Sequence, residues 1–244
     1  MNDKEFENKY MKYSSWAIWS DPSDGNWEGK TSIGEIDNMR IGDDIYSINE
    51  YSYSQLKSKD VKYIFVGLNP TSQSEIGKSY HTGDTADTQK SNDYKLRYAF
   101  HNTACWGAFL TDLFEEEASN ESALREKVRE KRNISLEAYA KERIPLIKDI
   151  RKQIGATAIV VAFGKTVYDL LKKDFEKEEL IKIPHFSNFY YNARDYRSVM
   201  LTRLGVYGFD TVNELNNKAL LCDCIKNRLG CSECPLDSFN CSHK

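Results

Sequence analysis

An apolar strand pattern that runs directly into Gly67-Leu68-Asn69-Pro70 constrains this chain more than any other feature of its sequence. Tyr63 to Val66 is apolar throughout, which is typical of a strand buried on both faces. Glycine tolerates backbone angles that other residues avoid, and proline fixes the turn that follows. Open α/β sheets bind ligands at the carboxyl ends of their strands. The sequence therefore predicts that Asn69 faces a cleft from a stiff backbone, where it can hold a water or read a polar ring.

Three further apolar segments also end in polar, turn-rich sequence. Ala158 to Phe163 runs into Gly164-Lys165 and a predicted helix over residues 166–172. Leu180 to Ile183 precedes residues 184–188, and Trp106 to Leu110 precedes residues 111–114. Helical patterns separate these strands at several places, as in a parallel sheet with helices on both faces. We expect an α/β fold with three α/β/α layers and a central, mostly parallel four-stranded sheet.

The order of these segments resembles the uracil-DNA glycosylase superfamily, and most of all its mismatch-specific uracil/thymine-DNA glycosylase branch. Gly67-Leu68-Asn69-Pro70 matches the first motif of that family, Gly-x-Asn-Pro. Thr111-Asp112-Leu113 stands where the branch has a second pocket-lining strand end. Residues 158–168 resemble its strand-Gly-Lys-helix unit, and His185-Phe186-Ser187 stands in place of the final His-Pro-Ser or Asn-Pro-Ser loop. The resemblance covers residues 62–204.

This resemblance implies a monofunctional DNA glycosylase, which hydrolyses the N-glycosidic bond of a damaged, mismatched or modified base flipped out of DNA. Such an enzyme serves repair or defence against phage with modified DNA. Asn69 would hold the attacking water, as the first motif implies. The departing base becomes an anion, and His185 is the candidate donor of a hydrogen bond to its carbonyl oxygen. Asn69 and His185 are the predicted catalytic residues.

Further side chains are candidates for binding the substrate. A carboxylate accepts hydrogen bonds from the exocyclic amine of cytosine, so Asp112 would favour a cytosine-derived base; its alternative role is a helix cap. Lys165 at a helix start would meet a phosphate or be a plain surface lysine. Tyr80 would sandwich the base, and Phe186, Tyr190 or Tyr191 would fill its place in the duplex. The predicted substrate-binding residues are Gly67, Leu68, Pro70, Tyr80, Asp112, Lys165, Phe186 and Ser187.

The chain departs from the family pattern at three points. An asparagine that reads uracil in several branches has no clear counterpart, because Asp112 stands near that point. Thr71 follows Pro70, where the family usually has glycine, and Phe186 replaces proline in the last loop. These departures support an alternative function, a noncatalytic nucleic-acid-binding module of the same fold that lost the geometry for positioning water.

Composition and patterning suggest three regions. With 244 residues of which 40% are hydrophobic, the chain can bury one core and a small appendage. Residues 1–60 are an aromatic-rich arm, in which Trp16, Trp19 and Trp27 would fasten the segment to the body. Residues 61–210 form the glycosylase-like domain, with a long polar loop from Ser72 to Asp93 over the cleft and two helices broken near Asn133. Residues 211–244 are a cysteine-rich tail.

The tail concentrates residues that bind metals. The candidate ligands are Cys222, Cys224, Cys231, Cys234, Cys241 and His243. Zinc takes four such ligands, and Cys-x-x-Cys is its usual half-site, so Cys231 and Cys234 are the best candidates. We expect a structural zinc; an iron–sulfur cluster or free thiols are the alternatives. The chemistry of the cleft requires no cofactor.

The charge and hydropathy of the chain bear on its partners and location. A net charge of −3 is unlike that of proteins that coat nucleic acid, but a glycosylase needs only a local positive rim on its DNA. No apolar stretch approaches the roughly 20 residues of a membrane span. Met1 to Tyr10 lacks the apolar core of a signal peptide. We expect a cytoplasmic protein with reduced or metal-bound cysteines and no membrane partner.

Overall fold

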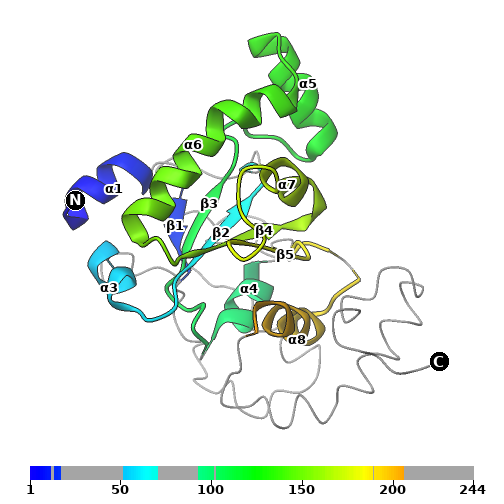
Figure 1. Ribbon diagram of the computed structural model, residues 1–244. Helices are drawn as coiled ribbons and strands as arrows, with labels where there is room; N and C mark the ends of the chain where they lie inside the picture. Colours follow the sequence, from blue (N-terminus) through cyan, green and yellow to red (C-terminus); the bar gives the residue numbers. More distant parts are fainter. Residues whose placement is uncertain (12–13, 18–51, 71–92, 102, 189, 206–244) are drawn as a thin grey trace.

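A computed structural model describes residues 1–11, 14–17, 52–70, 93–101, 103–188 and 190–205 (Figure 1). Strands and helices alternate along these residues. The strands are β1 (Ser14–Trp16), β2 (Tyr63–Gly67), β3 (Phe109–Asp112), β4 (Ile159–Phe163) and β5 (Leu180–Ile183). The helices are α1 (Asp3–Tyr10), α3 (Tyr53–Ser58), α4 (Asp93–Phe100), α5 (Glu121–Arg132), α6 (Leu136–Ile154), α7 (Gly164–Leu171) and α8 (Ala193–Leu204).

The strands form one mixed sheet in the order β1-β3-β2-β4-β5. The strands β3, β2, β4 and β5 are parallel, and β1 pairs antiparallel with β3 at one side. Gly67 is in register with Asp112, and Phe163 with Ile183, so the carboxyl ends of the parallel strands meet at one edge, here called the carboxyl edge. The α/β class is confirmed. The predicted strand count is wrong, because Ser14–Trp16, which the sequence places in an arm, adds a strand to the described sheet.

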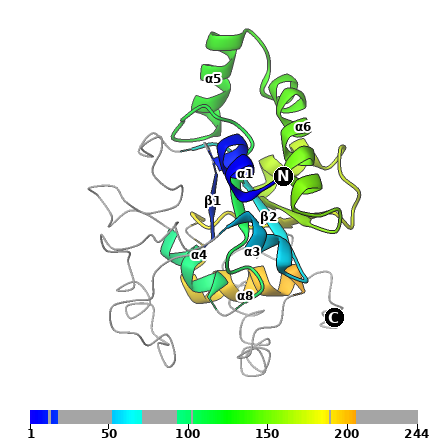
Figure 2. The ribbon, with the colours of Figure 1, turned by 90° about the vertical axis from the view of Figure 1, so that its left-hand side faces the viewer.

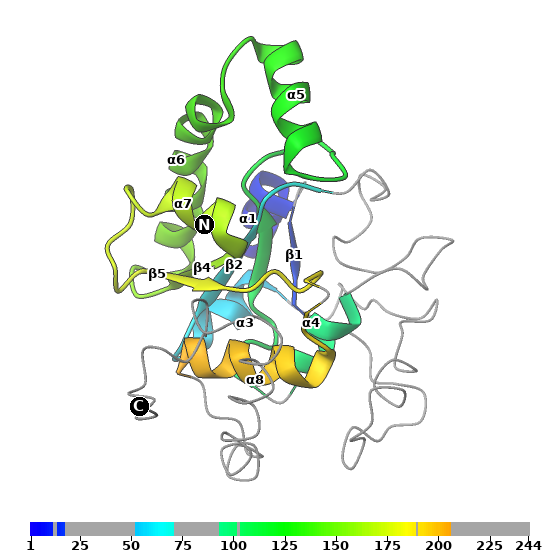
Figure 3. The same cartoon turned by 90° about the vertical axis from the view of Figure 1, so that its right-hand side faces the viewer.

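Helices cover both faces of this sheet, as the views in Figures 1 and 3 show. Alternate side chains of a strand point to opposite faces. Ile64 and Val66 of β2 pack into a core with buried side chains of α1, α3, α5, α6 and α7. Tyr63 and Phe65 pack into a second core with buried side chains of α4 and α8. Both faces of the strand are buried, which explains why its sequence is apolar throughout.

Aromatic side chains fasten the N-terminal elements to the sheet. The rings of Phe6 and Tyr53 stack with centroids 4.2 Å apart, and Trp16 packs edge-on against Phe109 of β3 at 5.3 Å. The hydroxyl of Tyr53 donates to the backbone oxygen of Gln153 in α6 over 2.6 Å. These contacts hold α1 and α3 beside the sheet (Figure 2). The predicted clamps Trp19 and Trp27 lie outside the described residues.

The helices α5 and α6 form a hairpin that projects from one end of the sheet (Figure 3). Asn133 ends α5 in the left-handed conformation (φ 55°), and the Ser135 hydroxyl caps α6 by accepting from the Ala138 amide over 3.1 Å. Asn tolerates this conformation better than most residues, and Ser is a preferred N-cap. The predicted break between two helices near Asn133 is confirmed.

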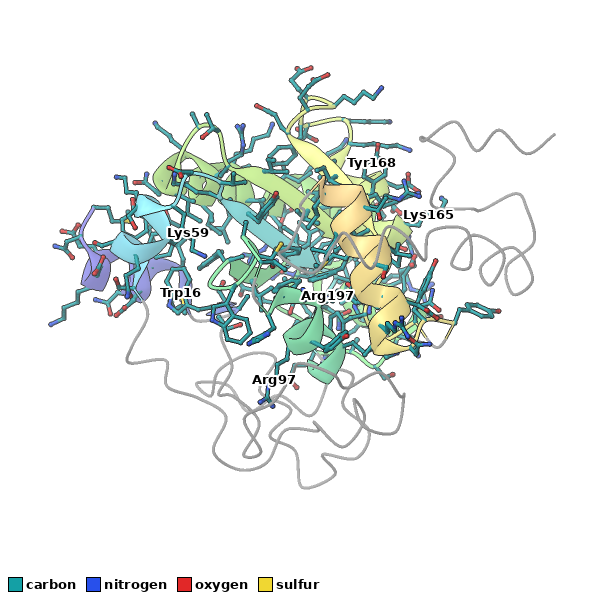
Figure 4. All side chains as sticks on the ribbon, turned by 90° about the horizontal axis from the view of Figure 1, so that it is seen from below. Trp16, Lys59, Arg97, Lys165, Tyr168 and Arg197 are labelled. Carbon is teal, nitrogen blue, oxygen red and sulfur yellow. The ribbon has the colours of Figure 1, made fainter. Side chains whose placement is uncertain are left out.

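On the opposite face, a buried arginine ties α8 to α4. The guanidinium of Arg197 donates from Nη1 to the backbone oxygens of Tyr98, Ala99 and His101 over 2.7, 3.1 and 2.9 Å. A cation at a helix C-terminus complements the partial negative charge there. Figure 4 shows Arg197 on α8, facing α4. This face of the sheet is therefore covered by two helices that are fixed to each other.

Candidate functional site: the carboxyl edge of the sheet

The described residues place four of the predicted site segments at the carboxyl edge. Asp112 ends β3, Gly67 ends β2, Gly164 follows β4, and His185 lies two residues beyond β5. Because the strand order is β3-β2-β4-β5, Asn69 and His185 leave the sheet on either side of β4. Neighbouring strands lie about 4.8 Å apart, so the ends of β2 and β5 are separated by about 10 Å. The fold thus brings the segments that carry the two predicted catalytic residues to one edge of the sheet, beyond strands that have one strand between them.

The side-chain amide of Asn69 has a fixed orientation. Its Nδ2 donates to the backbone oxygens of Pro70 and Ala118 over 2.6 and 2.8 Å. Two carbonyl acceptors determine which end of the amide carries the nitrogen, because only NH₂ can donate. Pro70 is buried and its carbonyl also accepts from the Ala118 amide over 3.0 Å. Oδ1 is therefore directed away from these carbonyls as an acceptor, the role needed to hold a water.

Gly67 and Asp112 lie against each other at the ends of β2 and β3. A Cβ at position 67 would lie 2.1 Å from Oδ1 of Asp112, so only glycine leaves room for this carboxylate. Asp112 is buried, with 4% of its surface exposed. Leu68 is partly buried and packs on the first core. The structure thus places a buried carboxylate beside the Gly-Leu-Asn-Pro turn.

His185 is held in one tautomer by the loop that follows it. The Ser187 amide donates to Nδ1 of His185 over 3.1 Å, so Nδ1 of the neutral ring is an acceptor. Nε2 then carries the proton and is the donor nitrogen. The Ser187 hydroxyl lies 2.7 Å from the same Nδ1. In the neutral ring, Nε2 is thus the nitrogen that can donate, and donation is the role that the resemblance implies for His185.

The ring of His185 is also fixed by aromatic packing. It stacks on Phe186 with centroids 4.4 Å apart and lies edge-on to Phe163 at 5.9 Å. Phe186 is 8% exposed and belongs to the second core, so it supports the histidine and is not placed as a wedge. Tyr191 is also buried, whereas Tyr190 is 43% exposed. Tyr190 is thus the most exposed of these three aromatics.

Gly164 makes the turn from β4 into α7, and β4 lies between the strands that lead to Asn69 and His185. Its φ of 84° is one that residues with a side chain rarely adopt, and a Cβ there would lie 3.7 Å from Cβ of His185. The Lys165 side chain is 82% exposed and forms an ion pair with Asp169 at 2.5 Å (Figure 4). Hydrogen bonds from Lys165 and Lys172 lower the pKa of the Asp169 carboxyl to about 2. Lys165 is accessible to a phosphate, but binding one would break its ion pair with the Asp169 carboxylate.

Two contributions to this edge escape sequence reasoning. The Ala118 carbonyl orients Asn69, but a backbone oxygen leaves no signature in a sequence. Lys95 is 4% exposed and its Nζ donates to the backbone oxygen of Asn188, in the loop after His185, over 3.2 Å. Its position just after a long polar loop is the only signal that the sequence offers. Lysine is rarely buried without a partner, so this contact fastens the histidine loop to α4.

Several predicted site residues lie outside the described residues. They are Tyr80, Cys222, Cys224, Cys231, Cys234, Cys241 and His243, together with Thr71 and the polar loop. Among the described residues, no group of three or more His, Cys, Asp or Glu side chains is arranged to hold a metal. The described Cys105 is a buried free thiol, and burial raises its pKa to about 12.

Fold and edge together define an open α/β protein with an oriented amide, an oriented imidazole and a buried carboxylate at the carboxyl ends of parallel strands. No protein-family model matches the chain, and neither a curated protein nor a solved structure matches it. Among the described helices, none combines the length and apolar character needed to cross a membrane. The geometry of the carboxyl edge is therefore the feature of this chain that bears on its function.

Proposed function

We propose that this chain is a DNA glycosylase with the three-layer fold of the uracil-DNA glycosylase superfamily, which hydrolyses the N-glycosidic bond of a flipped base. One observation carries the proposal. Asn69 and His185 reach the same edge from strands on either side of β4, and neighbouring backbone groups make Oδ1 the acceptor end of the Asn69 amide and Nε2 the donor nitrogen of the neutral His185 ring.

The reaction replaces the bond between the base and C1′ of the sugar with a bond from C1′ to a water oxygen. The sugar develops positive charge while the base leaves with the bonding electrons. Oδ1 of Asn69 would accept a hydrogen bond from the attacking water and hold it below C1′. Nε2–H of His185 would donate to the base carbonyl as its negative charge develops, and the proton lost by water neutralises the base. Losing one such preorganised donor typically costs about 2.7–4 kcal/mol in the barrier.

An amide positions water but accepts no proton at neutral pH, so the mechanism depends on leaving-group stabilisation more than on a general base. Extracting the base from a duplex costs a few kcal/mol, which an aromatic side chain offsets by filling the gap. The exposed Tyr190 lies five residues after His185, on the loop that holds the histidine. It is the described side chain best suited to that role, with Tyr80 remaining the predicted stacking partner of the base.

The direct test is a strand-cleavage assay on labelled duplexes that carry uracil, thymine mismatches or modified cytosines, followed by alkali to cut abasic sites. Asn69→Ala and His185→Ala are assayed beside the wild type. His101→Ala is the matched control, because it removes an imidazole that packs against Trp106 and is remote from the carboxyl edge. We expect product on at least one duplex, a fall of about 100-fold for His185→Ala and a comparable fall for Asn69→Ala, and no loss for the control.

The same experiment separates catalysis from the alternative. Tight binding to a duplex with no abasic product, from wild type and variants alike, would identify a noncatalytic nucleic-acid-binding module. Product that survives both substitutions would also overturn the proposal, because the reaction would then proceed at another site.

A further inference from the structure

The orientation of Asn69 depends on a neighbouring acidic loop, residues 113–118. This loop extends the pairing of β2 and β3 beyond the sheet: the amides of Leu113, Phe114 and Ala118 donate to the backbone oxygens of Gly67, Leu68 and Pro70 over 2.9, 3.0 and 3.0 Å. The Ala118 carbonyl then accepts from Asn69 Nδ2. The acidic loop therefore packs along the turn that carries Asn69 and is hydrogen-bonded to it.

Three basic side chains of the α5–α6 hairpin hold the acidic loop. Arg143 donates from Nε to the Leu113 carbonyl over 3.2 Å and pairs through Nη1 with Glu115 at 2.6 Å. Arg132 Nε pairs with Glu116 at 3.0 Å, and Lys127 Nζ donates to the Glu117 carbonyl over 2.8 Å. Every residue from 115 to 117 is thus held by one cation.

We propose that Arg143, Arg132 and Lys127 are positioning residues for Asn69: the hairpin sets the place of the acidic loop, and the loop sets the direction of the catalytic amide. Pro70 follows Asn69 in the chain and moves with it. Ala118 belongs to the acidic loop, which is joined to the turn by the hydrogen bond from the Ala118 amide to the Pro70 carbonyl and to the hairpin by the three basic side chains. The terminal torsion of an asparagine is broad, so one acceptor alone leaves the amide free to rotate. Release of the Ala118 carbonyl would therefore let Oδ1 leave the position in which it holds water.

Arg143 is the strongest of the three. Its side chain is 17% exposed, less than the 40% of Arg132, and its fork contacts the carboxylate and the backbone of the same loop. Lysine carries the same charge but is a point donor without the fork, so it cannot reproduce both contacts. Arg143→Met should thus release the loop, and Arg143→Lys should restore only part of the contact.

The test measures the amide directly as well as the reaction. In ¹⁵N-labelled full-length protein, the side-chain NH₂ signals of Asn69 are assigned by their loss in Asn69→Ala. We expect Arg143→Met to accelerate their hydrogen exchange by about 10-fold or more, because protection requires the hydrogen bonds to persist. In single-turnover assays the same variant should lower the rate constant about 10- to 100-fold. The substrate concentration for half-maximal rate should change less than about twofold, because a misplaced Asn69 amide slows the reaction more than it weakens substrate binding.

Arg129→Met is the matched control, because this arginine is exposed on α5 and, within the described residues, no hydrogen bond or ion pair joins its side chain to the acidic loop. It should change neither readout. Arg143→Lys should lie between wild type and Arg143→Met. If circular dichroism shows that Arg143→Met does not fold, Glu115→Gln removes the charge from the other side of the ion pair. It should change hydrogen exchange and the single-turnover rate in the same direction, by a smaller factor.

The kinetic readout rests on the proposed function, but the exchange readout does not. Faster exchange without glycosylase activity in the wild type would support the positioning network and overturn the proposed function. Unchanged exchange in both Arg143→Met and Glu115→Gln would overturn the positioning network, whatever the activity.

Discussion

Oδ1 of Asp112 lies where a side chain on Gly67 would begin, 2.1 Å from the Cβ position of that residue. The two residues are partners in the parallel register of β2 and β3. Gly67 of the Gly-Leu-Asn-Pro turn thus has a packing role beyond its backbone freedom: it makes room for the buried Asp112 carboxylate.

This contact predicts the effect of Gly67→Ala. The added methyl group would overlap the buried carboxylate, and overpacking of this kind costs about 1–3 kcal/mol of unfolding free energy. In an Asp112→Ala background the overlap is gone, and the same change should be neutral or slightly stabilising, because alanine restricts the unfolded chain more than glycine does. Urea denaturation of the four proteins in this double-mutant cycle measures both values. Equal costs in the two backgrounds would contradict the contact.

The two carbonyl acceptors of Asn69 predict that Asn69→Asp is more harmful than Asn69→Ala at neutral pH. Both substitutions remove the Asn69 donor from the Pro70 and Ala118 oxygens, at a cost of about 1–3 kcal/mol. The introduced carboxylate in addition faces these oxygens and is repelled by them. Repulsion raises the folded-state pKa of the new carboxyl above its unfolded value of about 3.9. The penalty is therefore absent well below pH 3.9, grows as the pH rises from there to the folded-state pKa, and is constant above it. Unfolding free energies at pH 3.5, 5 and 7 check this, with Asn69→Ala as the pH-independent control.

The sequence predicts the central strands because both of their faces are buried. β2 and β4 are short, uninterrupted apolar runs with a glycine at the end, a pattern that indicates a buried strand. The first strand could not be predicted in the same way. Ser14-Ser15-Trp16 is short, and two of its three residues are polar. It becomes a strand because it pairs with the edge of β3 and its Trp16 ring packs on Phe109. Tertiary pairing, which local sequence does not encode, decides that element.

The candidate site shows the same division. Asn69 and His185 stand out because they follow strand patterns directly, and topology alone then carries both to one edge. The contacts that orient them come from the backbone carbonyl of Ala118 and the backbone amide of Ser187. Every residue has such backbone groups, so the amino-acid type at these positions does not predict the contacts. The packing of Phe186 beneath His185 likewise depends on which face of the loop meets the core, and the sequence cannot specify that face.

The buried carboxylate at the carboxyl edge predicts a base preference, given the proposed function. A carboxylate accepts hydrogen bonds from an exocyclic amine but repels the carbonyl that uracil and thymine present at the same position. Asp112→Asn should therefore lower the single-turnover rate on cytosine-type bases about 10-fold or more, on the scale of 1–3 kcal/mol for such a pair, while the rate on uracil rises or stays. A glycosylase assay on matched uracil and modified-cytosine duplexes compares the two. An unchanged ratio of the rates would remove Asp112 from base recognition.

The cysteine-rich tail predicts a bound metal. Elemental analysis of protein purified without a histidine tag should find about one zinc per chain, as four of the six candidate ligands suffice for a tetrahedral site. Cys231→Ser with Cys234→Ser should remove it, whereas Cys105→Ser should not, because Cys105 is a buried thiol of the folded body. Iron with a visible absorption band would instead identify a cluster, and the absence of any metal from the wild type would contradict the prediction.

The attachment of α1 to α6 predicts a pH-dependent part of stability. Asp149 accepts hydrogen bonds from Lys9 and Tyr10, both at 2.7 Å, and these donors lower the pKa of its carboxyl. A lowered folded-state pKa means that the stabilisation is fully present above the unfolded pKa of about 3.9 and is lost as the pH falls through the folded-state pKa. Asp149→Asn should cost about 1 kcal/mol at pH 7, a small value because the group is partly exposed.

The difference between wild type and Asp149→Asn should shrink towards zero as the pH falls below the unfolded pKa. Urea denaturation of both proteins at pH 7, 5 and 3 measures it. Tyr10→Phe is the matched control, because it removes one neutral donor and leaves the carboxylate with its lysine; part of the pH dependence should survive in it. A difference that stays constant between pH 7 and pH 3 would show that the carboxylate holds α1 by shape and not by charge.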